Sequence, residues 1–411
     1  MGRQRFSRLR SWAYIAPAVL LIAAATLYPS SEPLDEPSAT APWVFTVFGE
    51  RGLADGISNV LLFAPLGVGL SLAGVARRRA IIAGALISSL IELAQVVIPG
   101  RDPNLGDVLS NTVGVAGGVL LATTAGQWLL PSPQRSRILA GAWTAGAALV
   151  AWVTVMLLQP SYPTSVYYGQ WTPNLGHLEW YRGRVLAAQV GALPVPSWRA
   201  ANSSMLRAAL LAGSPIQVRA TAGPRVPALG SLFSIADQQQ REIVLVGPDR
   251  DDLVYRYRTR AVALRLDSPD LRARHLLRGI RPGDSLNVMV SFEDGDTCLS
   301  ANGRRACGLS PGPGAGWSLI YFARHFPAWL VAMLDAAWLA MLAAPIGYWS
   351  PGKGARLMLG GALLVAVLGA SAYGGSMLLS EAVYVAGGLG LGAWARAAAL
   401  GRPPLRGARS P

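Results

Sequence analysis

Two apolar segments of the chain begin with the same polar pattern, Asp-x-x-Ser-Asn. The first copy contains Asp55 and Asn59, and the second contains Asp107 and Asn111. Residues four apart lie on one face of a helix, so each pair would form a polar patch at a helix start. Carboxylate and amide oxygens there can bond sugar hydroxyls or hold a divalent cation. Capping by each Asp and interhelical hydrogen bonding by each Asn are the structural alternatives.

A third apolar segment carries Glu92 and Gln95 one turn apart near its end at Pro99. Seven helical residues span about 10 Å, which places Glu92 just inside the hydrocarbon. A carboxylate there is costly and usually has a partner or a functional role. The following loop supplies Arg101, which we expect to be that partner. These groups would meet at one level of the membrane.

The composition favours a membrane protein with a water-facing part. Apolar residues make up 52% of the chain and charged residues 14%, and the mean hydropathy is +0.36. The net charge of +14 does not indicate nucleic-acid binding, because no basic block is interleaved with aromatic residues. A span needs about 20 apolar residues. Eight runs qualify, at about 12–28, 57–75, 80–98, 108–130, 138–158, 327–349, 356–373 and 377–398.

The basic residues alternate between the two sides of these spans. One set of loops holds fifteen Lys or Arg residues and no acids, whereas the short opposite loops, 29–56 and 99–107, hold two Arg and seven acids. Basic loops stay in the cytoplasm. We therefore predict a multi-pass protein of the bacterial cytoplasmic (inner) membrane with both termini cytoplasmic and residues about 159–326 extracytoplasmic. The first run could instead be a signal peptide, but its downstream sequence lacks a convincing cleavage site.

The long polar insert between the fifth and sixth spans has a β pattern. Apolar runs at 232–236, 242–246, 253–258, 261–266 and 285–292 are separated by turn residues. Many short strands of this kind favour a two-sheet sandwich. We expect three parts: a five-span core at 1–158, a β-sandwich at 159–326, and three spans with a basic tail at 327–411.

Cys298 and Cys307 frame the segment CLSANGRRAC. Asn302-Gly303 at its centre is a strong hairpin-turn signal. The two cysteines would lie on paired strands, and an external compartment would allow a disulfide to persist. Two free thiols are the alternative.

Residues about 160–322 resemble a laminin-G-like, concanavalin-A-like jelly roll, which implies a carbohydrate-binding domain and a glycan partner. The resemblance runs from the FSIADQQQREIVLVG segment to the ANG hairpin. Such folds include glucanases, but their carboxylate ladder is not visible here. The nearest acids, Glu293, Asp294 and Asp296, surround Gly295 and fit a solvated turn. Binding is expected in preference to hydrolysis.

Residues 55–118 resemble the VanZ-like membrane family. The resemblance rests on the residues already described, from Asp55 to Asn111, with Phe63, Pro65-Leu66-Gly67, Gly114 and Gly118. It implies a role at the cell envelope, linked in the founding case to low-level glycopeptide (teicoplanin) antibiotic resistance. The large insert, the last three spans and the lack of a nearby His depart from the minimal pattern.

Three functions remain open. A binding protein would hold a membrane lipid, a lipid-linked sugar or an envelope polysaccharide, with Arg101 on phosphate and the two Asn on hydroxyls. An enzyme would use Glu92 as general acid/base, although this core has no His or Cys. A structural anchor would use the polar stripe only for packing. A transporter is a weaker reading, and no cofactor or dedicated metal site is evident. Glu381 and Asp335 lie within later spans and fit function or packing equally.

Overall fold

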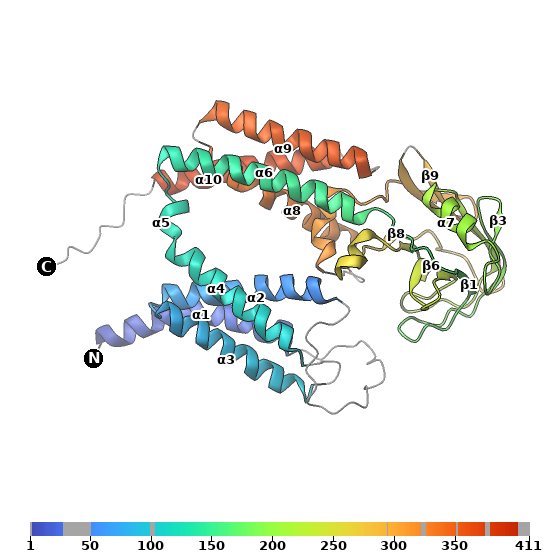
Figure 1. Ribbon diagram of the computed structural model, residues 1–411, viewed down its shortest axis with the longest axis horizontal. Helices are drawn as coiled ribbons and strands as arrows, with labels where there is room; N and C mark the ends of the chain where they lie inside the picture. Colours follow the sequence, from blue (N-terminus) through green and yellow to red (C-terminus); the bar gives the residue numbers. More distant parts are fainter. Residues whose placement is uncertain are drawn as a thin grey trace. The chain divides into compact units, whose positions relative to one another are not determined.

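The computed structural model describes residues 2–27, 51–98, 103–293, 295–321, 326–350, 352–374 and 379–401, with side chains from residue 13 onward. The chain forms two compact units, which Figure 1 colours along the sequence. The first comprises Met1–Gln134 with Leu264–Asp267, and the second comprises Arg135–Ala263 with Ser268–Pro411.

The first unit is helical. Its core contains Phe63, Leu66, Val115 and Val119, which lie on facing sides of neighbouring helices and are fully buried. Its elements are α1 (Gly2–Thr26), α2 (Gly52–Leu72), α3 (Arg77–Gln95), α4 (Leu105–Thr123) and the short α5 (Ala125–Trp128).

The second unit contains four long helices: α6 (Pro133–Leu158), α8 (Ala328–Trp349), α9 (Lys353–Gly374) and α10 (Leu379–Gly401). Every predicted span corresponds to a helix. Within the described residues, six helices are long and apolar enough to cross a membrane: α2, α4, α6, α8, α9 and α10. The multi-pass character is thereby supported, and the count of eight spans stays a prediction.

Asp335 and Glu381 contact a 3₁₀ helix, η2 (Pro313–Leu319), that precedes α8. The Trp317 indole N–H donates to Asp335 Oδ1 at 2.7 Å. The Gly314 N–H donates to Glu381 Oε1 at 3.0 Å, and the Ser371 hydroxyl donates to the other oxygen of Glu381. Both carboxylates therefore take part in packing this segment onto the helices.

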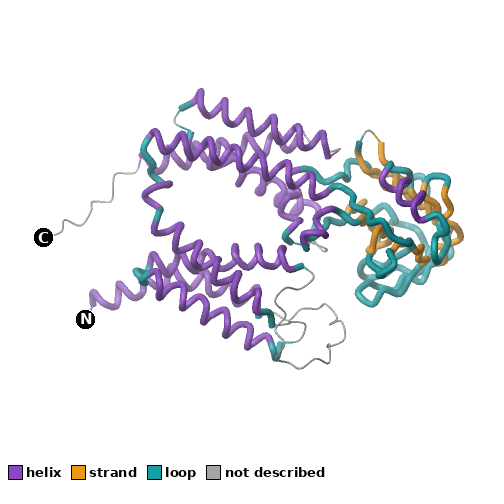
Figure 2. Tube along the Cα trace, viewed as in Figure 1, coloured by secondary structure: helices purple, strands orange, loops and turns teal. Residues whose placement is uncertain are grey.

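The strands form two antiparallel sheets, coloured orange in Figure 2. The first has the order β1-β5-β6-β7-β8, and the second β11-β10-β9-β4-β2-β3. The strands of the first sheet are β1 (Tyr168–Trp171), β5 (Phe233–Ala236), β6 (Glu242–Asp249), β7 (Asp252–Tyr257) and β8 (Leu271–Ala273). The strands of the second sheet are β11 (Arg304–Ala306), β10 (Asp296–Ala301), β9 (Ser285–Glu293), β4 (Ile216–Thr221), β2 (Arg184–Val190) and β3 (Leu193–Pro194). One helix, α7 (Ser203–Leu211), accompanies them.

Strand β7 alternates between the two faces of its sheet and is buried on both. Leu253, Tyr255 and Tyr257 face the main core of the β domain. Val254 lies on the other face, in a small apolar cluster. Arg256 shares that face and pairs with Asp270 at 2.6 Å. Burial raises the pKa of Tyr255 well above its ordinary value, so its phenol stays neutral in this core.

The predicted strand at 261–266 is wrong, because the chain forms the 3₁₀ helix η1 (Arg260–Leu264). Its backbone leaves the sheet as β7 ends. The Ser161 N–H donates to Arg258 O, and the Arg260 N–H donates to Gln159 O. These bonds tie the segment to the residues that follow α6.

The predicted hairpin and disulfide are present. Asn302 and Gly303 both have positive φ, 49° and 81°, as a two-residue turn between β10 and β11 requires. Cys298 and Cys307 are bonded across this hairpin.

The acidic turn behind the hairpin has structural partners. Asp296 Oδ1 accepts from the Thr297 and Ser310 N–H groups. A hydrogen bond from Arg305 holds the pKa of Glu293 below its usual range. Asp294 lies outside the described residues. The solvated-turn interpretation fits these contacts.

Candidate functional site

Close packing of α2 against α4 fixes the positions of the polar residues that these helices carry. A Cβ added to Gly67 would lie 2.1 Å from Val115 O, and one added to Gly118 would lie 2.0 Å from Ala64 O. Small residues allow such backbone contact between membrane helices. The α3 helix joins them where Gly84 faces the Val115 side chain. The three helices α2, α3 and α4 are thereby packed against one another.

Asp55, Asn59 and Asp107 form the accessible layer of the candidate site. The Asp107 carboxylate lies near the Asn59 amide and near the Asp55 carboxylate. All three side chains are partly exposed. Two carboxylates and an amide therefore present acceptors and one N–H donor group at the ends of α2 and α4.

Arg51 adds a cation to this layer. Its guanidinium lies 3.9 Å from Asp55, and its Nε donates to Asp267 Oδ1 at 2.8 Å. The Ala54 N–H also donates to Arg265 O, so the short segment Leu264–Asp267 contacts the start of α2. We did not foresee Arg51 as a site residue, although its place four residues before Asp55 is a usable signal.

Ser88, Glu92 and Asn111 form a buried layer, with exposed fractions of 0%, 3% and 2%. The Asn111 amide donates to Ser88 Oγ at 2.9 Å. Among the described residues, Asn111 Oδ1 is a buried acceptor with no hydrogen-bond donor. Ser88 is one turn from Glu92 on the same face of α3, a spacing that marks it as a neighbour.

Glu92 contacts the start of α4. Its Oε2 accepts from the Asn104 N–H at 2.8 Å, and the Asn104 side chain caps α4 by accepting from the Gly106 N–H at 2.8 Å. The expected partner, Arg101, lies outside the described residues. A backbone N–H is a partner that residue types alone do not reveal.

The structure brings the predicted residues together in part. Asp55, Asn59 and Asp107 lie near one another, and Asn111, one turn after Asp107 on α4, contacts Ser88 of α3. Gln95 points to α1 instead, where its amide donates to Thr26 O at 3.0 Å. This contact gives it a packing role between α1 and α3.

The simple capping interpretation is wrong for both aspartates. The α2 helix begins at Gly52 without a side-chain cap, so Asp55 lies in its first turn. The α4 helix begins at Leu105 and is capped by Asn104, so Asp107 also lies inside the helix. Both helices start earlier than their apolar runs.

Fold and site together define an integral membrane protein with several apolar helices and a two-sheet β domain. Residues 15–126 match the family model described as VanZ/LLP1. This match contains the entire candidate site on α2, α3 and α4. No curated protein and no solved structure matches the chain.

The arrangement suits recognition of a polyhydroxyl group. Carboxylates and amide oxygens accept hydrogen bonds from hydroxyls, and the amide N–H can donate in return. Among the described residues, no group of three or more His, Cys, Asp or Glu side chains is arranged to hold a metal ion.

Proposed function

We propose that the protein is a cell-envelope membrane protein that binds a lipid-linked sugar or envelope lipid through the accessible layer of α2 and α4. The observation that carries this proposal is that the partly exposed side chains of Asp55, Asn59 and Asp107 lie close together. These partly exposed polar groups lie at the ends of apolar helices, where a lipid headgroup would meet them.

The charges of this layer favour the sugar part of such a lipid. Asp55 and Asp107 would repel a bare phosphate but accept hydrogen bonds from hydroxyls. Arg51 lies at the edge of the layer and is partly engaged by Asp267. Arg101 remains our candidate for a phosphate contact, on the basis of the sequence.

The buried layer supports a fixed geometry for this binding. Asn111 and Ser88 link α4 to α3, while Glu92 accepts from the Asn104 N–H at the start of α4. Rigid helices with second contacts behind the binding groups hold a site more tightly than loops do. Gln95 extends this support to α1.

Binding is favoured over the enzyme alternative by the contacts of Glu92. A general acid/base must reach the reacting proton, whereas Glu92 is buried and its Oε2 accepts from the backbone of Asn104. The anchor alternative treats the same residues as packing alone. It does not account for Asp55 and Asp107, which remain partly exposed beside each other.

The remaining parts of the proposal follow from the sequence. Residues about 159–326 would face outward, where their β domain would contact glycan, and both termini would be cytoplasmic. The VanZ/LLP1 match supports an envelope role, and by resemblance we extend this to glycopeptide (teicoplanin) resistance or envelope polysaccharide.

The test is the melting temperature of the full-length protein in detergent. Undecaprenyl phosphate and a sugar-bearing peptidoglycan lipid precursor would be added separately. A ligand that binds only the folded state raises the melting temperature. We expect a larger rise with the sugar-bearing lipid, and Asp107→Asn should remove most of that rise while melting near the wild type without ligand.

Ser89→Ala is the matched control, because its hydroxyl donates to Ala85 O of its own helix. It should leave the ligand response unchanged. An equal ligand-induced rise in melting temperature in wild type and Asp107→Asn would contradict the proposal. No response in wild type, with Asp107→Asn already melting low, would favour the anchor alternative.

A further inference from the structure

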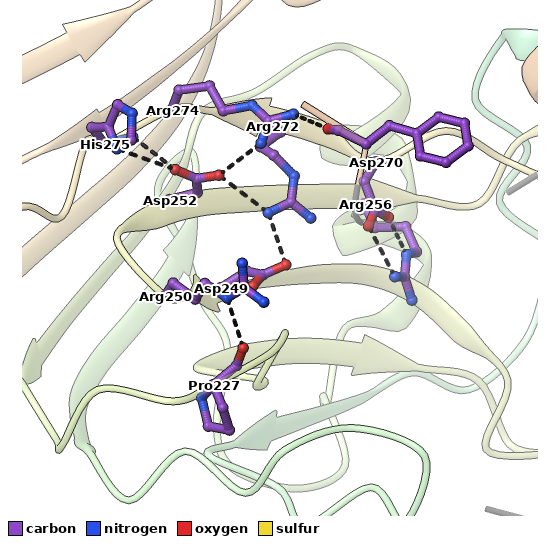
Figure 3. Close-up of polar contacts among 10 residues, drawn as sticks. Pro227, Asp249, Arg250, Asp252, Arg256, Asp270, Arg272, Arg274 and His275 are labelled. Atoms are coloured by element: carbon purple, nitrogen blue, oxygen red, sulfur yellow. Dashed lines mark hydrogen bonds and ion pairs between the residues drawn. The ribbon is translucent and has the colours of Figure 1, made fainter. Parts of the chain in front are cut away.

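The β domain carries a second charged site, which we name the arginine cleft. It has a volume of about 170 Å³ and lies at the β6–β7 turn and the end of the edge strand β8 (Figure 3). Its lining consists almost entirely of ionisable side chains: Arg225, Asp249, Arg250, Asp251, Asp252, Arg272, Arg274 and His275.

The three aspartates of the cleft are each matched by an arginine. Arg272 contacts Asp249 at 2.8 Å. Arg274 contacts Asp252 at 3.2 Å. The third pair, Arg225 with Asp251, has a separation of 2.9 Å. These three ion pairs neutralise the negative charge of the lining.

Arg250 supplies the remaining positive charge. In the part of the chain that the structure describes, no carboxylate pairs with it. Its Nε donates to Pro227 O at 3.0 Å, which orients the side chain and leaves the terminal Nη groups for another acceptor. His275 is largely exposed at the other side of the cleft, 4.0 Å from Asp252.

The backbone of the cleft is strained at these same two residues. Arg250 has φ 58° and His275 has φ 56°, both in the left-handed region. Residues other than glycine enter this region at an energetic cost, and such strain gathers at functional sites. Arg250 occupies the first position of a two-residue turn where glycine would fit without strain. An arginine in this strained position points to a use for its guanidinium.

The cleft adjoins the point at which the chain enters α8. Arg274 Nη2 donates to Phe326 O at 2.8 Å, immediately before Pro327 at the start of that helix. The Phe326 ring stacks with Trp317 and Tyr321, with centroid separations of 6.5 and 5.7 Å. Aromatic groups of this kind are typical of the membrane–water interface.

We propose that the arginine cleft binds a phosphoryl group, with Arg250 as the cation that its own lining does not neutralise. Guanidinium groups match the oxygens of phosphate in two-pronged hydrogen bonds. The phosphate can come from an anionic phospholipid at the adjacent interface or from solution. This site lies in the second unit and shares no residue with the site of the proposed function.

The test uses the full-length protein in neutral detergent, titrated with three probes. These are inorganic phosphate, a short-chain phosphatidic acid, and a phosphatidylcholine of the same chain length, with dissociation constants obtained from shifts in melting temperature. Arg250→Gly removes the guanidinium and also relieves the positive φ, so the variant should melt at or above the wild-type temperature. Its affinity for phosphatidic acid should fall by about tenfold or more.

Two variants serve as controls. Gln240→Gly relieves a similar positive φ, 59°, outside the cleft. Arg219→Gln removes an exposed arginine from β4. Both should bind phosphatidic acid as the wild type does, and so should Asp107→Asn, which separates this test from that of the proposed function.

Each outcome decides the proposal. Binding of phosphate and phosphatidic acid alike, with both lost in Arg250→Gly, assigns the cleft to the phosphoryl group itself. Binding of phosphatidic acid alone, lost in the same variant, assigns it to a lipid headgroup. Failure of every probe to bind wild type, or undiminished binding in Arg250→Gly, overturns it.

Discussion

Asp237 lies at the turn between β5 and β6 with a fully buried side chain. Its carboxylate accepts from the N–H groups of Gln239 and Arg241 and from the Arg241 guanidinium. Several donors around one carboxylate offset the cost of its burial. Glu92, also buried, accepts from the Asn104 N–H. The contacts of each carboxylate, rather than burial alone, determine what it can do.

We predict an acid-sensitive contribution of Asp237 to the stability of the β domain. Burial raises the pKa of this carboxyl, but the hydrogen bonds from Arg241 and Gln239 outweigh it and hold the pKa below the ordinary value. Stability from a lowered pKa is present above the unfolded-state value of about 3.9 and is lost as pH falls through the folded value. Asp237→Asn should cost about 1–3 kcal/mol at neutral pH.

The measurement is thermal unfolding followed by tryptophan fluorescence from pH 7 to pH 3. The wild type should lose more stability than Asp237→Asn below about pH 4. Asp284→Asn, at an exposed turn, is the control and should keep the wild-type profile. Parallel curves for wild type and Asp237→Asn would contradict the prediction.

At the scale of elements, glycines set the closest helix contacts in both units. In the first unit Gly67, Gly114 and Gly118 bring α2 and α4 together. In the second, a Cβ on Gly392 would lie 1.8 Å from Ala344 O, and one on Gly347 would lie 2.1 Å from Leu389 O. These contacts leave no room for a methyl group, so each helix pair is held at one separation.

The neighbouring glycines of α4 provide a matched pair of substitutions. Gly118→Ala should destabilise the protein by about 1–3 kcal/mol or more, because its methyl group would meet the backbone of α2. Gly117→Ala, where nothing lies within 4 Å, should be neutral or slightly stabilising because alanine favours the helix. Thermal unfolding in detergent compares the two. Equal melting temperatures of the two variants would show that α2 and α4 can move apart without loss of stability.

The sequence predicted the elements that have a recognisable pattern of residue types. It did not predict contacts made by backbone groups. Apolar length predicted every long helix, and Asn302-Gly303 predicted the hairpin that the disulfide spans. The run at 261–266 failed because its apolar residues fit a 3₁₀ turn as well as a strand. The common membrane level of the span ends placed Asn59 near Asp107, but one donor to Glu92 is the backbone N–H of Asn104, a group that residue type does not single out. Only coordinates identify such a partner.

At the scale of the whole molecule, the distribution of basic residues predicts which parts of the chain face each side of a membrane. Lys353 is the only lysine in the sequence, and it begins α9 in the segment that we predict to be cytoplasmic. The β domain carries the disulfide, which an oxidising compartment preserves. The proposed topology therefore requires Lys353 to lie on the cytoplasmic side and the β domain to lie on the opposite side.

An amine-reactive reagent that cannot cross membranes tests this topology. In intact cells it should leave Lys353 unmodified, and it should modify Lys353 after permeabilisation, as measured by peptide mass spectrometry. Gln238→Lys places an amine at an exposed position of the β domain and should react in intact cells. Modification of Lys353 before permeabilisation would reverse the proposed orientation.

The backbone contact between α2 and α4 also restricts how a lipid can arrive. A hydrocarbon chain cannot pass sideways between helices at the positions of Gly114 and Gly118, where a single methyl group does not fit. In the binding mode that we propose, the headgroup would approach over the helix ends, past Asp55 and Asp107, and the tail would stay outside the pair. The α2–α4 pair would thus bind the lipid headgroup and leave the hydrocarbon tail in the bilayer. In this respect it would differ from proteins that enclose a whole lipid.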